Sequence, residues 1–304
     1  MLDRNSSTLE IQSWFVPFDI LMILSTTFTI IANIIFISII ILDRTCHTVP
    51  MMLTANTCLS LLVFGSIRMS MSVFVLYSDL QPIYYQYSSC ELLGYMVYVA
   101  YAVQNYSFFQ QAFYRYMVVV YPTRFFWQST KFHCLTICFI WAFAFVCCLP
   151  YILADEIEYN IPNYICQLRF GLSFFILYCM FTIYIVPMLA IMTIYLKLVR
   201  HVREMSQHVS STNTLIRAQR ELKIFRRTVI FVHGLIIIGL PYALFIFISF
   251  FTSPPKYHFR ISYAFGDVLL PFLMIVLFVF TEPVQASVKK KINGRMNLVL
   301  PLAT

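Results

Sequence analysis

Long apolar runs are the feature that most restricts how this sequence can fold. A helix needs at least about 18 mostly apolar residues to cross a lipid bilayer. Runs of this kind occur seven times, at about 17–42, 50–77, 88–114, 132–153, 170–196, 228–251 and 261–281. Only 11% of the residues are charged, against about 25% in a water-soluble domain, so the polar surface is too small to cover a globule in water. We therefore predict an all-α membrane protein, a bundle of seven transmembrane helices.

Seven such helices use nearly the whole chain and leave room for one domain. We expect an extracellular N-terminal segment (1–16), a seven-helix domain (17–287) and a cytoplasmic tail (288–304) with a short amphipathic helix along the membrane. The first sixteen residues are too polar for the apolar core of a signal peptide, so the first transmembrane helix is expected to direct insertion. Asn5 lies in "NSS", which is a glycosylation site if the N-terminus is outside and otherwise a chance triplet.

Basic residues are distributed unevenly between the two ends of the predicted helices. Most of the 21 lysines and arginines lie in the loop 197–227, after residue 287, or at Arg44, Arg124 and Lys131, all on one side by helix counting. The opposite side holds few basic residues, and its stretch "ADEIEY" is acidic. The positive-inside rule places the basic side in the cytoplasm and the N-terminus outside. The net charge of +8 then reflects topology, and no nucleic-acid partner is expected.

Cysteine positions suggest one disulfide. Of the nine cysteines, most fall inside the apolar runs, where they are expected to be small apolar fillers. Cys46 lies on the cytoplasmic side, where thiols stay reduced. Cys90 and Cys166 both lie on the oxidising outer side. A disulfide between them would tether the loop before the fifth helix across the extracellular mouth; the alternative is two free thiols.

Several landmark residues stand in a characteristic order and spacing along the chain, in or near the apolar runs. Arg115 follows Cys90 by twenty-five residues (115 − 90), and the others are Asn33, Asn56, Pro122, Trp141, Pro150, Pro187, Tyr195, Glu221 and Pro241. In this combination the chain resembles a rhodopsin-like (class A) G-protein-coupled receptor over about residues 17–292. The resemblance implies a multi-pass receptor of the plasma membrane whose partners are the lipid bilayer, an extracellular ligand and a heterotrimeric G protein at the cytoplasmic face.

The same resemblance assigns an activation switch. Arg115, followed by Tyr116, is expected to pair with Glu221 in the resting state and to open a G-protein cleft when helix six swings outward. The remaining switch residues are Tyr195, which would support the moved arginine, and the helix prolines Pro187, Pro241 and Pro283. From its position alone, Arg115 has a second interpretation as an anchor whose side chain reaches the membrane surface. Glu221 also has a second interpretation, as a solvated residue whose basic neighbours at helical spacing pair with it.

The chain also departs from the family pattern. Tyr114 replaces the acid before the arginine, Leu61 replaces the aspartate of a sodium site, and Gly239 stands where helix six usually has tryptophan. Two prolines, Pro271 and Pro283, compete for the proline that ends helix seven, and Pro283 is preferred because it leaves a workable loop after helix six. Such changes are compatible with a divergent receptor, with high basal activity or with poor coupling.

The outer half of the chain offers candidate ligand contacts. They are Arg68, Tyr98, Tyr101, Gln104, Tyr178, Tyr242, Tyr263 and Asp267. Arg68 is interpreted either as an anchor for a ligand carboxylate or as the partner of Glu91 or Asp267; the tyrosines either line a pocket or only pack. The stretch 156–170 reads as a β-hairpin, which in this family is typical of peptide receptors. A neuropeptide is the best guess for the ligand, and the alternative is a chemosensory receptor for small molecules.

Other ligands and classes of function are disfavoured. Val97 stands where amine receptors have an aspartate, and no lysine follows Arg260 before Lys289, so no retinal Schiff base is expected there. The six histidines are scattered, and no glycine-rich phosphate loop is present, so no enzyme, metal site or cofactor is predicted. A transporter would need broken helices and midplane charges. A non-signalling decoy receptor is permitted by the eroded motifs.

Overall fold

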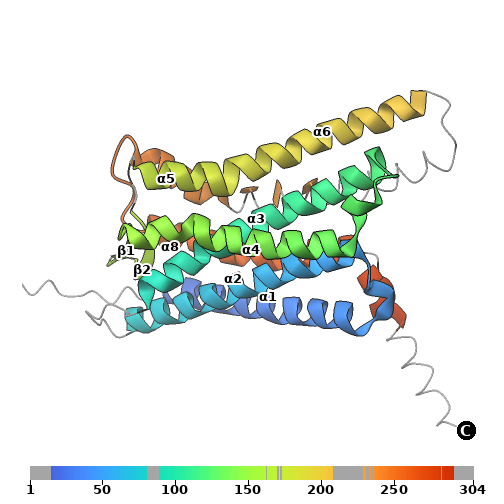
Figure 1. Cartoon of the computed structure of the whole chain (residues 1–304). Coiled ribbons are helices and arrows are strands. Elements are labelled where there is room, and N and C mark those ends of the chain that lie inside the picture. Colours follow the sequence, from blue (N-terminus) through green and yellow to red (C-terminus); the bar gives the residue numbers. More distant parts are fainter. Residues whose placement is uncertain are drawn as a thin grey trace, which may run out of the picture.

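The computed structural model describes most of the chain. The residues described are 15–80, 89–161, 163–169, 171, 173–207, 229–230, 233–234, 236–237, 239–281 and 283–290. Within them the chain forms long helices that lie side by side as a bundle (Figure 1). Two short strands cap one end of the bundle. The predicted all-α architecture is therefore confirmed.

The helices have the following bounds, and the predicted spans match them to within a few residues at most ends. They are α1 (Val16–Leu42), α2 (Val49–Leu80), α3 (Cys90–Val120), α4 (Thr130–Leu153), α5 (Phe174–Cys179), a π-helical turn (Met180–Ile185), α6 (Val186–Gln207), the helix Gly239–Ser249, and α8 (His258–Phe280). Short 3₁₀ turns occupy Arg44–Cys46 and Phe125–Gln128. The strands are β1 (Ile157–Asn160) and β2 (Ile165–Leu168).

Five of the described helices are long and apolar enough to cross a membrane. They are α1, α2, α4, the continuous rod from α5 through α6, and α8. The helix α3 is as long but carries polar side chains at positions such as Gln104, Gln111 and Arg115. These side chains are buried because α3 packs against α2, α4 and α6. A central helix can be more polar than its neighbours because protein, rather than lipid, surrounds it.

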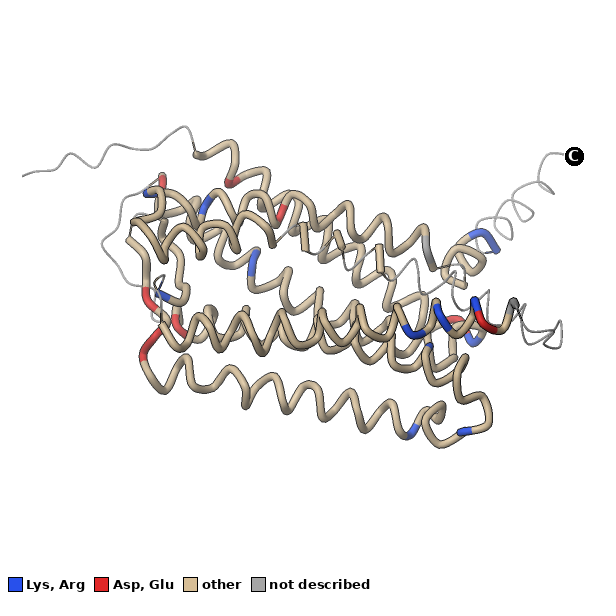
Figure 2. The backbone as a smooth tube through the Cα atoms, turned by 90° about the horizontal axis from the view of Figure 1, so that it is seen from above, with Lys and Arg blue, Asp and Glu red and all other residues tan. Residues whose placement is uncertain are grey.

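Charged residues separate toward the two ends of the bundle (Figure 2). Basic residues gather at the end of the bundle away from the hairpin. Acidic residues are more frequent at the hairpin end. This distribution agrees with the positive-inside pattern from which a cytoplasmic C-terminus is predicted.

A polar junction joins α2, α3 and α4 near the centre of the bundle. The Asn56 amide donates to the Ser107 hydroxyl at 2.7 Å, and the Trp141 indole N–H donates to the Asn56 carbonyl at 2.9 Å. Asn56 and Ser107 are buried, so each bond satisfies a group that has no access to water. Two of the landmark residues, Asn56 and Trp141, therefore fix the packing of three helices.

The rod from α5 through α6 is interrupted by one π-helical turn. Pro187 has no backbone N–H, so the carbonyl of Ile183 loses its usual intrahelical donor. The side-chain amide of Asn105 on α3 donates to this carbonyl at 2.9 Å, and the Tyr106 hydroxyl donates to the Thr182 carbonyl at 2.9 Å. The wide turn is therefore stabilised from outside the rod, by α3.

Replacing Asn105 by leucine is expected to destabilise the protein by about 1–3 kcal/mol, because the Ile183 carbonyl then stays buried without a donor. The measurement is the melting temperature of the detergent-solubilised protein. Gln128→Leu is the matched control, since the Gln128 amide bonds backbone carbonyls in an exposed loop. Equal melting temperatures for the two variants would contradict the role given to Asn105.

The end of the bundle after α8 differs from the prediction in one respect. The helix α8 ends at Phe280 and holds Pro271 in its interior. Pro283 lies instead in a separate helix over 283–290. The prediction that Pro283 is the proline of helix seven is therefore wrong about the helix to which it belongs. The short helix packs Val284 into a buried cluster with Phe36 and Ile40 of α1. The short helix was expected within the tail 288–304, whereas the structure describes it from residue 283, five residues earlier.

Candidate ligand pocket and cytoplasmic switch

The strands form a hairpin that lies over one end of α3. They pair antiparallel, with Ile157 opposite Leu168 and Tyr159 opposite Cys166, which confirms the predicted hairpin. A disulfide joins Cys166 to Cys90 at the start of α3. Gly94 allows the close approach, because a Cβ there would come within 2.8 Å of the Ile157 side chain and 3.2 Å of the Cys166 carbonyl.

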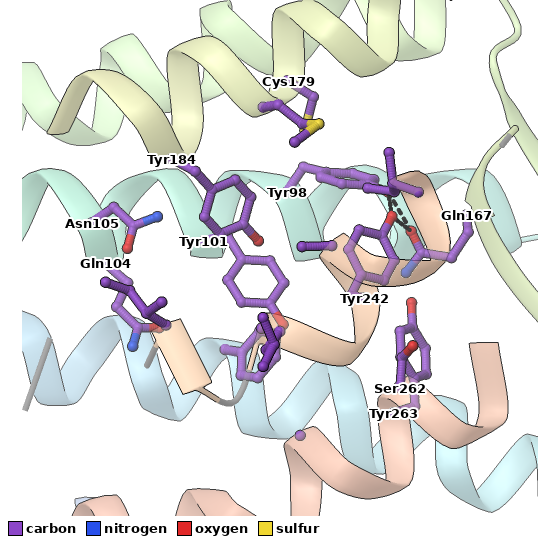
Figure 3. Close-up of a pocket in the computed structure, with 18 of the residues that line it drawn as sticks. Tyr98, Tyr101, Gln104, Asn105, Gln167, Cys179, Tyr184, Tyr242, Ser262 and Tyr263 are labelled. Carbon is purple, nitrogen blue, oxygen red and sulfur yellow. Dashed lines mark hydrogen bonds between the residues drawn. The ribbon is translucent and has the colours of Figure 1, made fainter. Parts of the chain in front are cut away.

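A pocket of about 340 Å³ opens beneath this hairpin (Figure 3). Its walls come from α2, α3, the rod from α5 through α6, the helix Gly239–Ser249, and α8. Most of the predicted ligand contacts line it, namely Arg68, Tyr98, Tyr101, Gln104, Tyr242, Tyr263 and Asp267. Tyr178 does not: its hydroxyl donates to the Cys147 carbonyl on α4, and its ring packs on Tyr151. The candidate Tyr178 therefore belongs to helix packing and not to the lining.

Three polar side chains connect the hairpin, α3 and the helix Gly239–Ser249 at the top of the pocket. The Tyr98 hydroxyl donates to the Gln167 carbonyl oxygen of β2. Tyr242 donates to the same oxygen at 3.3 Å, and the two tyrosine hydroxyls lie 2.9 Å apart (Figure 3). The triad therefore connects the hairpin to α3 and to the helix Gly239–Ser249, which is called helix six below because it lies in the sixth predicted apolar run (228–251). Gln167 was not among the predicted site residues, although its place beside Cys166 in the hairpin strand was a usable signal.

Arg68 and Asp267 form a buried two-point ion pair between α2 and α8. The Arg68 Nε donates to Oδ1 at 2.9 Å and Nη2 donates to Oδ2 at 2.6 Å. The ring of Tyr263 lies against the guanidinium, 3.4 Å from its carbon to the ring centroid. Glu91, the other partner considered, is exposed. Of the two interpretations of Arg68, the structure shows the internal partner, which is Asp267.

A second buried pair joins the same two helices nearer the hairpin. Arg260 donates to both carboxylate oxygens of Asp79, at 2.6 and 2.7 Å. The sequence analysis missed this pair because it ended the second apolar run at 77 and began the seventh at 261, which left both residues in loops. The structure extends α2 to Leu80 and begins α8 at His258, so both charges lie inside helices.

The half of the bundle away from the hairpin holds part of the predicted switch. Arg115 is 9% exposed on α3, and Tyr116 is half-buried with its ring 6.1 Å from that of Tyr121. Tyr114, which replaces the usual acid, packs its ring against His133 of α4. Tyr195 packs at the margin of the main hydrophobic core. The site residues that remain are placed as follows: Pro187 in α6, Pro241 in the helix Gly239–Ser249, and Glu221 and Asn5 outside the described residues.

No group of three or more potential metal ligands gathers anywhere in the part of the chain that the structure describes. The pocket therefore has to be understood from its hydrogen-bonding and apolar side chains.

Comparisons with known proteins identify the family. Residues 32–281 match the family model described as 7 transmembrane receptor (rhodopsin family). The structure is similar to the crystal structure of squid rhodopsin, with a TM-score of 0.76 and 14% identity over 93% of this chain and 87% of that chain. At this identity the similarity shows the fold alone. No curated protein sequence matches the chain. Because the family model spans most of the sequence, the chain belongs to the rhodopsin family of seven-transmembrane receptors.

Proposed function

We propose that this G-protein-coupled receptor of the plasma membrane is switched on when an extracellular ligand enters the pocket beneath the hairpin and moves helix six outward. The observation that carries the proposal is the hydrogen-bonded triad of Tyr98, Gln167 and Tyr242. It connects the hairpin to α3 and to helix six at one point of the pocket wall. A ligand that binds better to the rearranged triad shifts the receptor toward the open state.

The cytoplasmic part of the mechanism uses Arg115. In the closed state we assign Glu221 at the start of helix six as its partner. Outward movement of helix six separates the two residues and opens a cleft for the G protein, in which Tyr195 supports the arginine. The change needs no covalent chemistry, so the proposed activity is that of a signalling receptor and not of an enzyme.

For the ligand we favour a small molecule over a peptide. The charges in the pocket wall are already paired, since Arg68 is held by Asp267. Outside the pocket, Glu158 pairs with Arg169 across the hairpin, which weakens the attraction of the acidic stretch "ADEIEY" for a cationic peptide. A neuropeptide remains the second candidate, because the hairpin supplies a rim along which an extended chain could bind.

The test of the switch is basal G-protein activation in cells at matched surface expression. Glu221→Ala is expected to raise basal output and Arg115→Ala to lower it, each by about fivefold or more if the pair holds 1 kcal/mol of coupling. Arg124→Ala is the matched control, because Arg124 lies in the exposed loop after α3. If neither variant differs from this control, the switch assigned to Arg115 is wrong and a non-signalling decoy becomes the better interpretation.

A further inference from the structure

Gly239 leaves an open space in the pocket wall. A glycine inside a helix is costly because it orders a flexible backbone without adding a packing side chain. At Gly94 and Gly234 a Cβ would meet a neighbouring atom within 3 Å, so close packing accounts for these glycines. At Gly239 a Cβ would meet nothing within 4 Å, although the residue lines the pocket. Gly239 therefore leaves open space beside the pocket lining, and a larger side chain at this position would fill it.

The rest of the lining is largely apolar. It includes Ile185 and Met188 of the rod, Ile236 and Leu240 of helix six, and Leu270 of α8. A flat apolar group of a ligand would pack well against such walls. A polar group placed at Gly239 would lose its hydrogen bonds to water without gaining a partner in the protein.

Two buried hydrogen-bond donors in the same pocket lack acceptors. Arg68 Nη1 and the Tyr263 hydroxyl are buried, and neither makes a hydrogen bond with the described residues. Both residues line the pocket, and the two side chains are stacked on one another. An arginine nitrogen can only donate, so it needs an acceptor. Both atoms have almost no exposed area, so a ligand oxygen reaches them, and satisfies a donor that the protein leaves open, once the stacked Tyr263 side chain shifts to admit it.

The charge balance selects against ions. Asp267 already neutralises Arg68 through two hydrogen bonds. A ligand carboxylate would have to displace Asp267 or add an uncompensated negative charge in a site with little polar surface. A ligand ammonium would lie beside the Arg68 guanidinium, which carries the same charge and can only donate hydrogen bonds. Both are expensive beside a buried ion pair in a mostly apolar site.

We propose that the pocket binds a neutral small molecule that combines one hydrogen-bond-accepting oxygen with a flat apolar ring. The oxygen accepts from Arg68 Nη1 and the Tyr263 hydroxyl, and the ring occupies the open space at Gly239. This assignment rests on the proposed ligand site, but it concerns binding alone and does not depend on coupling to a G protein.

The probe is an alkyne-tagged benzophenone, a neutral aromatic ketone that photolabels nearby methionines. Full-length receptor in membranes is irradiated with the probe, and labelled methionines are located by mass spectrometry. Met188 lines the pocket, whereas Met192, one helical turn further along α6, is exposed outside it and reports on labelling from the lipid. We expect excess acetophenone to reduce labelling of Met188 but not of Met192, and to do so more than ethylbenzene, benzoate or phenyltrimethylammonium.

Variants test the two contacts separately. Gly239→Phe is expected to lower Met188 labelling about tenfold or more, the equivalent of losing 1.4 kcal/mol of binding. Ile237→Phe, two residues earlier in the chain and outside the lining, is the matched control. Tyr263→Phe removes one donor and is expected to reduce the advantage of acetophenone over ethylbenzene.

The proposal is overturned if benzoate competes as well as acetophenone in the unmodified receptor, a comparison that needs no variant to fold. It is also overturned if Gly239→Phe labels Met188 as strongly as Ile237→Phe does. If labelling behaves as expected while Arg115→Ala and Glu221→Ala leave signalling unchanged, the ligand assignment stands and the proposed signalling function fails.

Discussion

Replacing Arg68 by methionine is expected to destabilise the receptor by about 3–5 kcal/mol, because the Asp267 carboxylate is then buried without its cation. Both side chains are almost fully buried, so water cannot compensate for the lost partner. The melting temperature of the solubilised receptor and its surface expression report the effect. The double variant Arg68→Met/Asp267→Leu removes both charges together and is expected to recover most of the stability.

The exposed pair between Arg169 and Glu158 supplies the control for this experiment. Both of its members reach solvent, so Arg169→Met should leave the melting temperature close to that of the unmodified receptor. If the double variant Arg68→Met/Asp267→Leu were as unstable as Arg68→Met alone, the loss would come from packing of the arginine and not from an unpaired charge.

Removing the disulfide with Cys90→Ser/Cys166→Ser is expected to cost about 2–5 kcal/mol. The bond closes a long loop, since the cysteines are 76 residues apart, and it holds β2 against α3 where Gln167 meets Tyr98. The expected results are a lower melting temperature and loss of any ligand response that depends on the triad of Tyr98, Gln167 and Tyr242. Both are measured in the same membranes.

Cys134→Ser/Cys138→Ser is the matched control for the disulfide, because these two free cysteines lie exposed on α4. A reducing agent should lower the melting temperature of the unmodified receptor and of this control, but not that of Cys90→Ser/Cys166→Ser. Equal sensitivity of all three proteins to the reducing agent would show that the disulfide does not carry the stability assigned to it.

The parts of the fold that follow from sequence are those with a strong local signal. Length and apolarity of the runs predict the helices, and residue alternation about a turn predicts the hairpin. The pocket tyrosines could be named because they lie in the outer halves of apolar runs at helical spacing. Tyr178 satisfied the same criterion and still points toward α4, since the rotation of a helix about its axis depends on its neighbours.

The parts that could not be predicted depend on contacts between distant segments. Asp79 and Arg260 lay only two and one residues outside the predicted spans, and helix ends are where sequence patterns are least informative. The π-helical turn is stabilised by Asn105, which is distant in sequence, so the residues around the turn carry no pattern that predicts it. Pro283 was placed in helix seven from a motif that has lost its asparagine and tyrosine, whereas the structure shows a new helix beginning there.

The two ion pairs between α2 and α8 have a consequence for biosynthesis. Their partners are separated by 199 and 181 residues, so α2 leaves the ribosome long before α8 exists. Until then α2 carries Arg68 and Asp79 in an otherwise apolar segment. A lone charge costs about 2.5–3.5 kcal/mol during insertion at the centre of a membrane helix, and less toward an end such as that of Asp79. The nascent chain therefore has to keep α2 near the insertion machinery, or in contact with water, through the synthesis of four further helices. Membrane assembly of this receptor is complete only when its last transmembrane helix arrives.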